Sequence, residues 1–345
     1  MAEHSIKVGL IGAGGNVRNR HIPGFNKVDD LEILAVADRS VESGRSVADQ
    51  FNIPRVYSGW QELLEDEDIN AVCIGTWPYM HRTLTLAALA KGKHVLTEAR
   101  MASTSQEARD MLDASREYPN LVCQLTPTST TYKIDRVLKR MIKEGYLGQL
   151  LTIEIQALQN RFVDFGGDLH WRHSWELSGY NTLNIGAAYE SMMRWFGRGS
   201  SVMAMGKIHV PYRKDDSGEL VSVNIPDHVD ILYRLANDAQ VHMRMSATTG
   251  HSTGNQIWLY GSEGTIYIDQ NQNIFAGRRG DDSLAEVPNP VEDQAYYRVE
   301  EEFANAIRGQ EKITMVPFES GVHYMEWTEA VVRSIQTGMM VQLPL

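Results

Sequence analysis

The first candidate for chemistry is a glycine-rich stretch near the N-terminus. Gly12, Gly14, Gly15, Asn16 and Val17 directly follow an apolar run and open a helical pattern. Glycines permit a tight turn there and let backbone N–H groups approach a pyrophosphate, whose charge the N-terminus of a helix favours. The order of strand, turn and helix predicts that these residues bind a dinucleotide. Val17 replaces the third glycine of the pattern, which loosens the contact between helix and strand without blocking phosphate binding.

An acidic residue follows at the place where such a site needs one. Asp38 ends the next apolar run, Leu31 to Ala37. A carboxylate at this position binds the ribose hydroxyls and repels a 2′-phosphate, which favours NAD. Arg39 beside it is able to hold that phosphate, so NADP stays open as the alternative.

A third group of candidates follows the fourth expected strand. Thr76, Trp77 and His81 come directly after the apolar run Ala71 to Gly75. In parallel α/β sheets ligands bind at the carboxyl ends of the strands, so we include these residues in the predicted cofactor site. Two interpretations of Trp77 stay open: a pocket wall beside the nicotinamide ribose, or ordinary core filling.

The second half of the chain offers a polar and aromatic loop for substrate chemistry. It contains His170, Trp171, Arg172 and His173. Histidine exchanges protons near neutral pH, and arginine binds carboxylate, phosphate or sulfonate groups in a fixed fork. The sequence thus predicts Arg172 as a substrate anchor and His173 or His170 as the proton acceptor. The alternative is that both histidines bond backbone groups. No metal is predicted, because two histidines without a third ligand do not make a site.

A helix expected from Asn181 to Phe196 supplies the remaining candidates. Successive residues turn by about 100°, so Ala188 lies about 40° from Asn184 and the two share a face. We expect this face to point toward the nicotinamide. Glu190 projects elsewhere, about 240° from Asn184, and a structural ion pair is its expected role. Tyr189 is intermediate, at about 140°, and is expected to reach a cleft only from the flank.

The elements that must position these residues alternate regularly in the first third of the chain. Apolar runs and helical patterns follow one another at short intervals, which is typical of a parallel sheet with helices on both faces. We therefore predict a doubly wound α/β domain over residues 1–127. The expected strands are Ile6 to Ile11, Leu31 to Ala37, Ala71 to Gly75, His94 to Thr97 and Leu121 to Gln124, and the expected helices are Val41 to Phe51, Tyr79 to Lys91 and Ser105 to Glu117.

The pattern changes after residue 127. Alternating apolar and polar residues predict half-exposed strands, and the turn residues between them indicate a mostly antiparallel, open sheet. We assign residues 128–345 to a second, α+β domain. Its expected strands lie at 151–156, 202–210, 228–235, 240–247, 256–260 and 265–269, and its expected helices at 132–143, 181–196, 293–308 and 319–337.

Composition excludes several classes of protein. Lys and Arg total 33 against 44 Asp and Glu, a net charge of −11, which argues against a nucleic-acid partner. No stretch reaches the roughly 18 apolar residues of a membrane span, and Met1 to His4 lack the layout of a secretory signal. Cys73 and Cys123 sit in apolar runs, where buried thiols of a reducing compartment are expected. A cytoplasmic protein without a membrane partner is predicted.

The whole chain resembles the Gfo/Idh/MocA oxidoreductases, which include glucose–fructose oxidoreductase and inositol dehydrogenase. The resemblance implies a Rossmann domain that binds NAD, an open sheet used for dimer or tetramer contacts, and a sugar-like polyol or related small molecule as substrate. It also implies that Glu98 contacts the nicotinamide end. The residues that carry it are Gly12-Ala13-Gly14, Asp38, Thr76 to His81, Val95 to Glu98, Trp171-Arg172, Ser178-Gly179, Leu183 to Gly186 and Phe303 to Gly309.

This chain departs from the family at the positions that matter for proton transfer. Relatives carry a lysine, an aspartate and a histidine where this sequence has Ala99, Asn184 and Ala188. Oxidising an alcohol by hydride transfer needs a group that accepts the hydroxyl proton, and alanine has none. Arg100 follows Ala99 but has too high a pKa to act as a base.

Three hypotheses follow. The first is an NAD(P)-dependent oxidoreductase for a sugar-like or other polar molecule, with a non-standard proton relay. The second is NAD-dependent glycoside cleavage by transient oxidation, elimination and re-reduction. The third is a nucleotide-bound sensor or scaffold that has lost catalysis.

Overall fold

A computed structural model describes residues 5–128 and 131–345. The chain divides into two compact units, Met1–Pro127 with Arg298–Met325 and Thr128–Tyr297 with Glu326–Leu345, and each is described by itself. The sequence-based boundary assigned 298–325 to the second domain. Residues 298–325 pack with the first unit instead, because Leu125 N donates to Val316 O at 3.1 Å and Gln124 Nε2 donates to Glu302 Oε2 at 2.6 Å. Met1 to His4, where no secretory signal was expected, lie outside the described residues.

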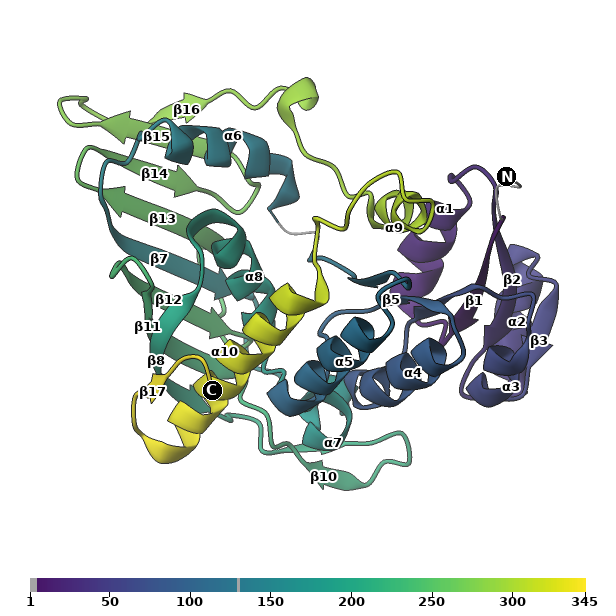
Figure 1. Ribbon diagram of the computed structural model, residues 1–345. Helices are drawn as coiled ribbons and strands as arrows, with labels where there is room; N and C mark the ends of the chain where they lie inside the picture. The colour runs from purple at the N-terminus through teal and green to yellow at the C-terminus, as the bar shows by residue number, and fades with distance from the viewer. Residues whose placement is uncertain (1–4, 129–130) are drawn as a thin grey trace. The chain divides into compact units, whose positions relative to one another are not determined.

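The described residues of the first unit form a six-stranded parallel sheet in the order β3-β2-β1-β4-β5-β6 (Figure 1). This confirms the predicted doubly wound domain. The order reverses between β1 and β4, which is the switch point where such sheets bind ligands. The strands are β1 (Ile6–Ile11), β2 (Leu31–Ala37), β3 (Arg55–Tyr57), β4 (Ala71–Ile74), β5 (His94–Thr97) and β6 (Cys123–Leu125).

Local capping chemistry fixes several helices of this unit. The hydroxyl of Ser40 accepts from Ser43 N at the start of one helix, and Thr104 Oγ1 accepts from Glu107 N at the start of another. Side-chain caps of this kind satisfy backbone donors that have no partner within the helix. The helices are α1 (Ile22–Phe25), α2 (Val41–Phe51), α3 (Trp60–Glu65), α4 (Pro78–Ala90), α5 (Ser105–Glu117) and α9 (Val299–Ile307), and a π-helical segment, Val17–His21, precedes α1.

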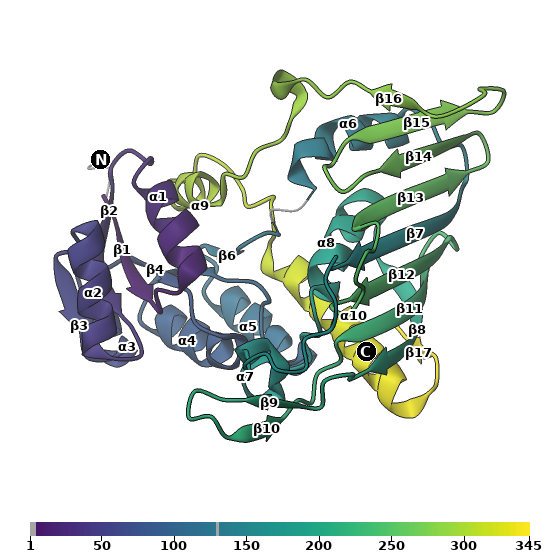
Figure 2. The same cartoon turned by 180° about the vertical axis from the view of Figure 1, so that it is seen from behind.

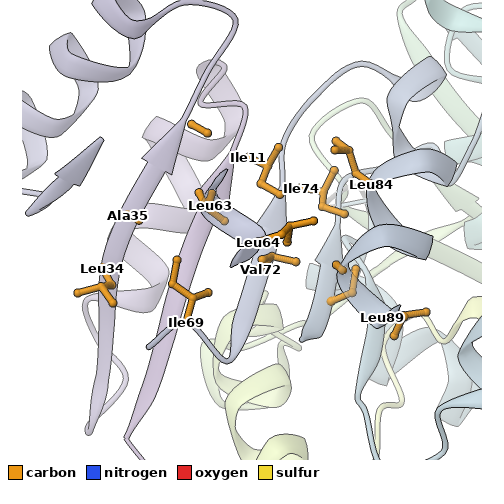
Figure 3. Close-up of a cluster of buried hydrophobic side chains, with 13 residues drawn as sticks. Ile11, Leu34, Ala35, Leu63, Leu64, Ile69, Val72, Ile74, Leu84 and Leu89 are labelled. Carbon is orange, nitrogen blue, oxygen red and sulfur yellow. The ribbon is translucent and has the colours of Figure 1, made fainter. Parts of the chain in front are cut away.

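A hydrophobic core joins the parallel sheet to its helices (Figure 3). Ile11 and Val72 of adjacent strands lie in it together with Leu63 of α3 and Leu84 of α4, all nearly inaccessible to solvent. Burial of each such side chain stabilises the fold by about 1.5–3 kcal/mol. The carboxyl ends of β1, β2, β4 and β5, where the candidate residues lie, are held on this core.

The second unit is built on a mixed, mostly antiparallel sheet, as predicted. Its described residues form nine strands in the order β16-β15-β14-β13-β7-β12-β11-β8-β17, and among these pairs β7 and β12 run parallel. A separate two-stranded hairpin joins β9 and β10. The strands are β7 (Leu150–Leu158), β8 (Gly199–Lys207), β9 (Tyr212–Lys214), β10 (Leu220–Ser222), β11 (His228–Leu235), β12 (Gln240–Ser246), β13 (Asn255–Gly261), β14 (Gly264–Ile268), β15 (Ile274–Arg278), β16 (Ala285–Val287) and β17 (Val341–Gln342).

Helices cover one face of this nine-stranded sheet (Figure 1). They are α6 (Tyr132–Lys143), α8 (Ile185–Phe196) and the part of α10 (Phe318–Thr337) that belongs to this unit; a single turn, α7 (Trp175–Ser178), precedes α8. Tyr189 of α8 stacks on Trp327 of α10 with ring centroids 4.3 Å apart, and Tyr233 of β11 packs edge-on against both. The aromatic cluster fixes both helices on the sheet.

The opposite face of the sheet has no helix over it in the part of the chain that the structure describes (Figure 2). Strand register aligns one row of side chains across this face, which we call the open-face row. Trp258 stacks on Tyr267 in this row with ring centroids 4.2 Å apart. The row runs through Met203, Leu232, His242, Glu154, Trp258, Tyr267 and Phe275.

Two helix starts differ from the sequence prediction. The helix expected at Asn181 begins at Ile185, because Leu183 takes a left-handed φ of 46° and Asn184 is not helical. The helix expected at residue 293 begins at Val299 after a separate 3-10 turn, Val291–Asp293. Among the described residues, no helix combines the length and apolarity needed to cross a membrane.

Candidate functional site

The glycine-rich turn after β1 forms a cradle of exposed backbone. Gly12 has a φ of +78°, and a Cβ there would lie 2.8 Å from Thr76 Cγ2, so the turn requires glycine. Gly14 and Gly15 are exposed, and a Cβ added to Gly15 would meet nothing within 4 Å. The first backbone bond of the following helical run is donated by Arg18 N to Gly14 O at 3.1 Å. The preceding N–H groups therefore lack helical acceptors and suit a phosphate.

Val17, which replaces the third glycine, packs closely instead of loosening the turn. It is 1% exposed and lies against Gly75 at the end of β4. A Cβ on Gly75 would overlap Val17 Cγ2 and approach Gly12 O to 2.5 Å. The expectation of a looser contact is wrong, because the absent side chain of Gly75 provides the space for Val17.

Two hydrogen bonds fix the orientation of the Asp38 carboxylate. Its Oδ1 accepts from Arg39 N at 2.9 Å, and its Oδ2 accepts from Ser43 Oγ at 2.6 Å. These two bonds hold the carboxylate at the carboxyl end of β2 while Asp38 stays partly exposed. Arg39 is exposed beside it.

The residues after β4 differ in their burial and in their hydrogen-bond partners. Thr76 Oγ1 is buried and has no hydrogen-bond partner among the described residues, which suits a ligand atom. Trp77 is 38% exposed, so the core-filling interpretation is wrong. His81 is fully buried: its Nε2 is 3.0 Å from Thr76 O, and its Nδ1 is 3.0 Å from Arg100 O. Its predicted cofactor contact has no support here, since it joins two backbone segments; burial lowers its pKa.

Glu98 belongs to a charged cluster that the sequence analysis missed. Its Oε1 is 2.9 Å from His21 Nε2 and accepts a hydrogen bond from Asn16 Nδ2. His21 Nδ1 in turn is 2.6 Å from Glu300 Oε1. Burial alone would lower the pKa of His21, but the hydrogen bonds to Glu300 and Glu98 outweigh it and raise that pKa to about 9. Burial opposes ionisation of Glu98 too, and the bond from His21 nonetheless lowers its pKa.

The local sequence gives no signal for the role of His21. His21 follows the polar run Arg18-Asn19-Arg20, and nothing in this local pattern distinguishes a buried charged histidine from an exposed one. Glu300 lies 279 residues further along the chain, and no local pattern connects such distant positions.

In the second unit, the two candidate histidines bond backbone groups, which is the alternative interpretation. His170 Nδ1 accepts from Arg172 N at 3.2 Å, and His173 Nδ1 accepts from His170 N at 3.0 Å, around the 3-10 turn Trp171–His173. Burial, with Arg213 and His170 nearby, lowers the pKa of His173 to about 4; burial and Arg172 also lower that of His170. A neutral ring whose Nδ1 accepts carries its hydrogen on Nε2. Both rings therefore offer donors rather than bases.

Arg172 is exposed beside these rings. Its guanidinium carbon lies 4.0 Å from the centroid of the Trp171 ring, a cation–π arrangement. The loop that carries Arg172 is tied to β9, since Leu169 N donates to Lys214 O at 2.6 Å and Arg213 Nη1 donates to Gly167 O at 3.0 Å.

The side chains in and before α8 lie on the sides of the helix that its geometry predicts, except that of Tyr189. Asn184 is exposed at the start of the helix, and Ala188 is half-buried on the same face. Glu190 forms the expected ion pair, with Arg194 Nη1 at 2.5 Å. Tyr189 is 1% exposed, and its hydroxyl accepts from Gly199 N at 2.8 Å. Its predicted catalytic role has no support here, because its ring packs against Trp327.

Comparison with known proteins finds a family match for each of the two units. Residues 6–125 match the model described as oxidoreductase family, NAD-binding Rossmann fold, and residues 136–267 match the model described as GFO/IDH/MocA C-terminal domain. The chain belongs to the Gfo/Idh/MocA oxidoreductases. It is accordingly an NAD-binding oxidoreductase, as the resemblance implied.

Individual relatives of this family member are distant. Levoglucosan dehydrogenase of Pseudarthrobacter phenanthrenivorans is 27% identical over 268 residues, which cover 71% of this chain and 68% of that protein. The dTDP-3,4-didehydro-2,6-dideoxy-alpha-D-glucose 3-reductase of Streptomyces violaceoruber is 26% identical over 314 residues, 88% of this chain and 86% of the reductase. A solved structure of levoglucosan dehydrogenase in complex with NADH and L-sorbose shares the fold, with a TM-score of 0.84 at 21% identity, covering 98% of this chain and 99% of that one.

Proposed function

We propose that this oxidoreductase transfers a hydride between NAD and a sugar-like small molecule. The observation that carries the proposal is the exposed backbone of Gly14 and Gly15 at the start of a helical run, beside the oriented carboxylate of Asp38. Relatives named for levoglucosan and for a dTDP-linked sugar support a substrate rich in hydroxyl groups. When bound, a nicotinamide supplies the hydride acceptor or donor.

The chain's own residues then bind and orient the cofactor and the substrate. The N–H groups of the turn bind a pyrophosphate, Asp38 accepts from ribose hydroxyls, and Thr76 Oγ1 bonds the ligand on the other side of the switch point. Arg172 anchors a polar or anionic group of the substrate. The Nε2–H groups of His170 and His173 donate to a substrate oxygen, and Asn184 adds an exposed amide. These groups bind and orient the substrate through hydrogen bonds; in place of the family's lysine, aspartate and histidine, solvent water takes up the hydroxyl proton as the hydride leaves.

The cofactor assignment is tested by replacing Asp38 with asparagine. Loss of the charge removes both the strong acceptor for ribose hydroxyls and the repulsion of a 2′-phosphate. We expect the Kd for NAD to rise about tenfold and the Kd for NADP to change less or fall, measured by titration calorimetry. Asp49→Asn, an exposed carboxylate of α2, is the matched control. An unchanged NAD affinity in Asp38→Asn would contradict the assignment.

The substrate assignment is tested by measuring NADH formation in the wild type and in Arg172→Gln. With saturating NAD and a panel of free sugars, sugar acids and sugar phosphates, we expect the wild type to form NADH and Arg172→Gln to lose about tenfold to hundredfold in kcat/KM, with NAD affinity unchanged. Arg161→Gln, another exposed arginine of the unit, should keep wild-type activity. A wild type that binds NAD but turns over no member of the panel would favour the scaffold hypothesis.

We further propose that two copies of the chain associate through the open-face row. Met203 and Leu232 are 42% and 46% exposed at one end of the row, and the stacked rings of Trp258 and Tyr267 lie beyond His242 and Glu154 in the same row. Apolar and aromatic side chains aligned on one sheet face are typical of a protein interface. Sedimentation equilibrium is expected to give at least twice the chain mass of 38.9 kDa, and Trp258→Glu is expected to reduce it to one chain. A wild type that sediments as a single chain would exclude this association.

A further inference from the structure

The cluster around Glu98 is attached to the cofactor cradle itself. Asn16, which donates to Glu98, is part of the turn whose glycines are exposed. Ala99 N donates to the other oxygen, Oε2, at 3.3 Å. The Glu98 carboxylate is therefore fixed from the turn, from its own backbone and from His21, and its orientation does not depend on a ligand.

The three charged side chains of the cluster are buried to different extents. The side chains of His21 and Glu300 are 0% and 6% exposed, whereas that of Glu98 is 13% exposed. Two carboxylates and one imidazolium carry a formal net charge of −1. Because His21 and Glu300 lie behind Glu98, the uncompensated charge is presented on the side of Glu98, where solvent or a ligand has access.

The strand order shows which half of a dinucleotide meets this charge. Asp38 ends β2, on one side of β1, and binds the ribose of the adenosine half. The remaining half extends across the switch point toward the carboxyl ends of β4 and β5. Glu98 directly follows β5, and Thr76 with its unpartnered hydroxyl follows β4. The charged cluster thus lies on the nicotinamide side of the turn.

We propose that Glu98, His21 and Glu300 act together as a specificity element for the oxidation state of the cofactor, favouring NAD⁺ over NADH. The inference rests on NAD binding by the first unit as set out above. The nicotinamide ring carries a positive charge in NAD⁺ and none in NADH. A fixed single negative charge beside the ring stabilises the first form and leaves the second nearly unaffected. His21 and Glu300 act as positioning residues, since they set the charge and orientation of Glu98 without facing the ligand.

The proposal explains why a buried imidazolium bridges two carboxylates here. Two unbridged carboxylates would repel each other, and one would take up a proton and lose its charge. The imidazolium bonds one oxygen of each carboxylate and offsets one of their two formal negative charges, which leaves a formal net charge of −1. Glu300→Gln or Glu98→Gln reduces the formal net charge of the cluster to zero while keeping the size of the side chain and a hydrogen-bonding group.

The test compares three ligands on the full chain by titration calorimetry at about pH 6, where a histidine with an ordinary pKa is still largely protonated. ADP-ribose lacks the nicotinamide and reports the cradle alone; NAD⁺ and NADH report the ring. We expect the ratio of the Kd for NADH to that for NAD⁺ to exceed one in the wild type and to fall by roughly tenfold in Glu300→Gln and Glu98→Gln. The Kd for ADP-ribose should stay constant.

Glu301→Gln is the matched control, since Glu301 lies next to Glu300 on α9 but pairs with Arg298 on the surface. It should keep the wild-type ratio. A ratio that is the same in all four proteins, with ADP-ribose bound normally, would overturn the proposal and leave NAD binding intact. Failure of the wild type to bind ADP-ribose, NAD⁺ and NADH alike would instead overturn the proposed function. Should Glu300→Gln not fold, the more exposed Glu98→Gln carries the same comparison.

Discussion

Replacing Arg194 with methionine is expected to lower the free energy of unfolding by about 3–5 kcal/mol. The Arg194 side chain is only 12% exposed and binds two buried carboxylates, Asp135 at 2.9 Å and Glu190 at 2.5 Å. Its Nη2 also donates to Thr131 Oγ1 at 2.7 Å, and its guanidinium lies over the ring of Tyr132, 4.4 Å from the centroid. Methionine fills much of the space but removes the guanidinium from both carboxylates, and leaves Asp135 with the more distant Lys139 Nζ at 3.8 Å. Urea unfolding followed by tryptophan fluorescence measures the loss.

The cost should come from the loss of the guanidinium beside the two carboxylates rather than from lost packing. Asp135 and Glu190 keep other bonds, from Trp195 Nε1 at 2.7 Å and from Thr128 N at 3.0 Å, so the two carboxylates remain in place after the substitution. Adding Glu190→Gln to Arg194→Met should therefore recover part of the stability. Arg140→Met, which breaks an exposed pair with Asp293 at 3.5 Å, should cost less than about 1 kcal/mol. Equal losses in Arg140→Met and Arg194→Met would contradict this account.

The same ion pairs attach α8 to the neighbouring helices, so the position of its exposed first turn is fixed. Arg194 and Glu190 fix the helix to α6 through Asp135, and Tyr189 fixes it to α10. Asn184 is exposed at the start of this helix, and Ala188 is half-buried one turn further on.

Local sequence signals predicted the strands and the helix around the glycine-rich turn well. The glycine-rich turn, Asp38 and the bounds of β1, β2 and α2 follow from the order of residues within short windows, because apolar periodicity, caps and turns are local properties. The short strands β15, β16 and β17, which lie at or next to the edges of the sheet, were missed, since a few residues carry little periodic signal and their pairing is decided by the neighbouring strand.

The candidate catalytic residues were harder to predict, for a different physical reason. Residue type suggested that His170 and His173 accept protons, but the role of an imidazole depends on which nitrogen is already bonded. The backbone of the 3-10 turn occupies Nδ1 of both rings. Similarly, Tyr189 has a suitable hydroxyl, but Gly199 N occupies it. Backbone partners of this kind are invisible to spacing arguments.

His21 is expected to make the stability of the first unit fall as pH rises from about 6.5 to 9. The pKa of His21 is about 9 in the folded chain against 6.5 ordinarily, so the folded state binds the proton more tightly. The stabilisation is fully present below pH 6.5 and is lost as pH rises through 9. A difference of this size corresponds to about 3 kcal/mol. The groups that face the ring are Glu98, Glu300 and the Thr126 hydroxyl.

His21→Asn is the variant that isolates this contribution. Asparagine bonds one carboxylate but carries no charge, so we expect a destabilisation of about 3 kcal/mol at pH 6 that shrinks toward zero by pH 9.5. Urea unfolding midpoints across that range measure the difference from the wild type. A difference between His21→Asn and the wild type that stays constant with pH would mean that the ring of His21 acts by packing, and that the two carboxylates do not require its charge.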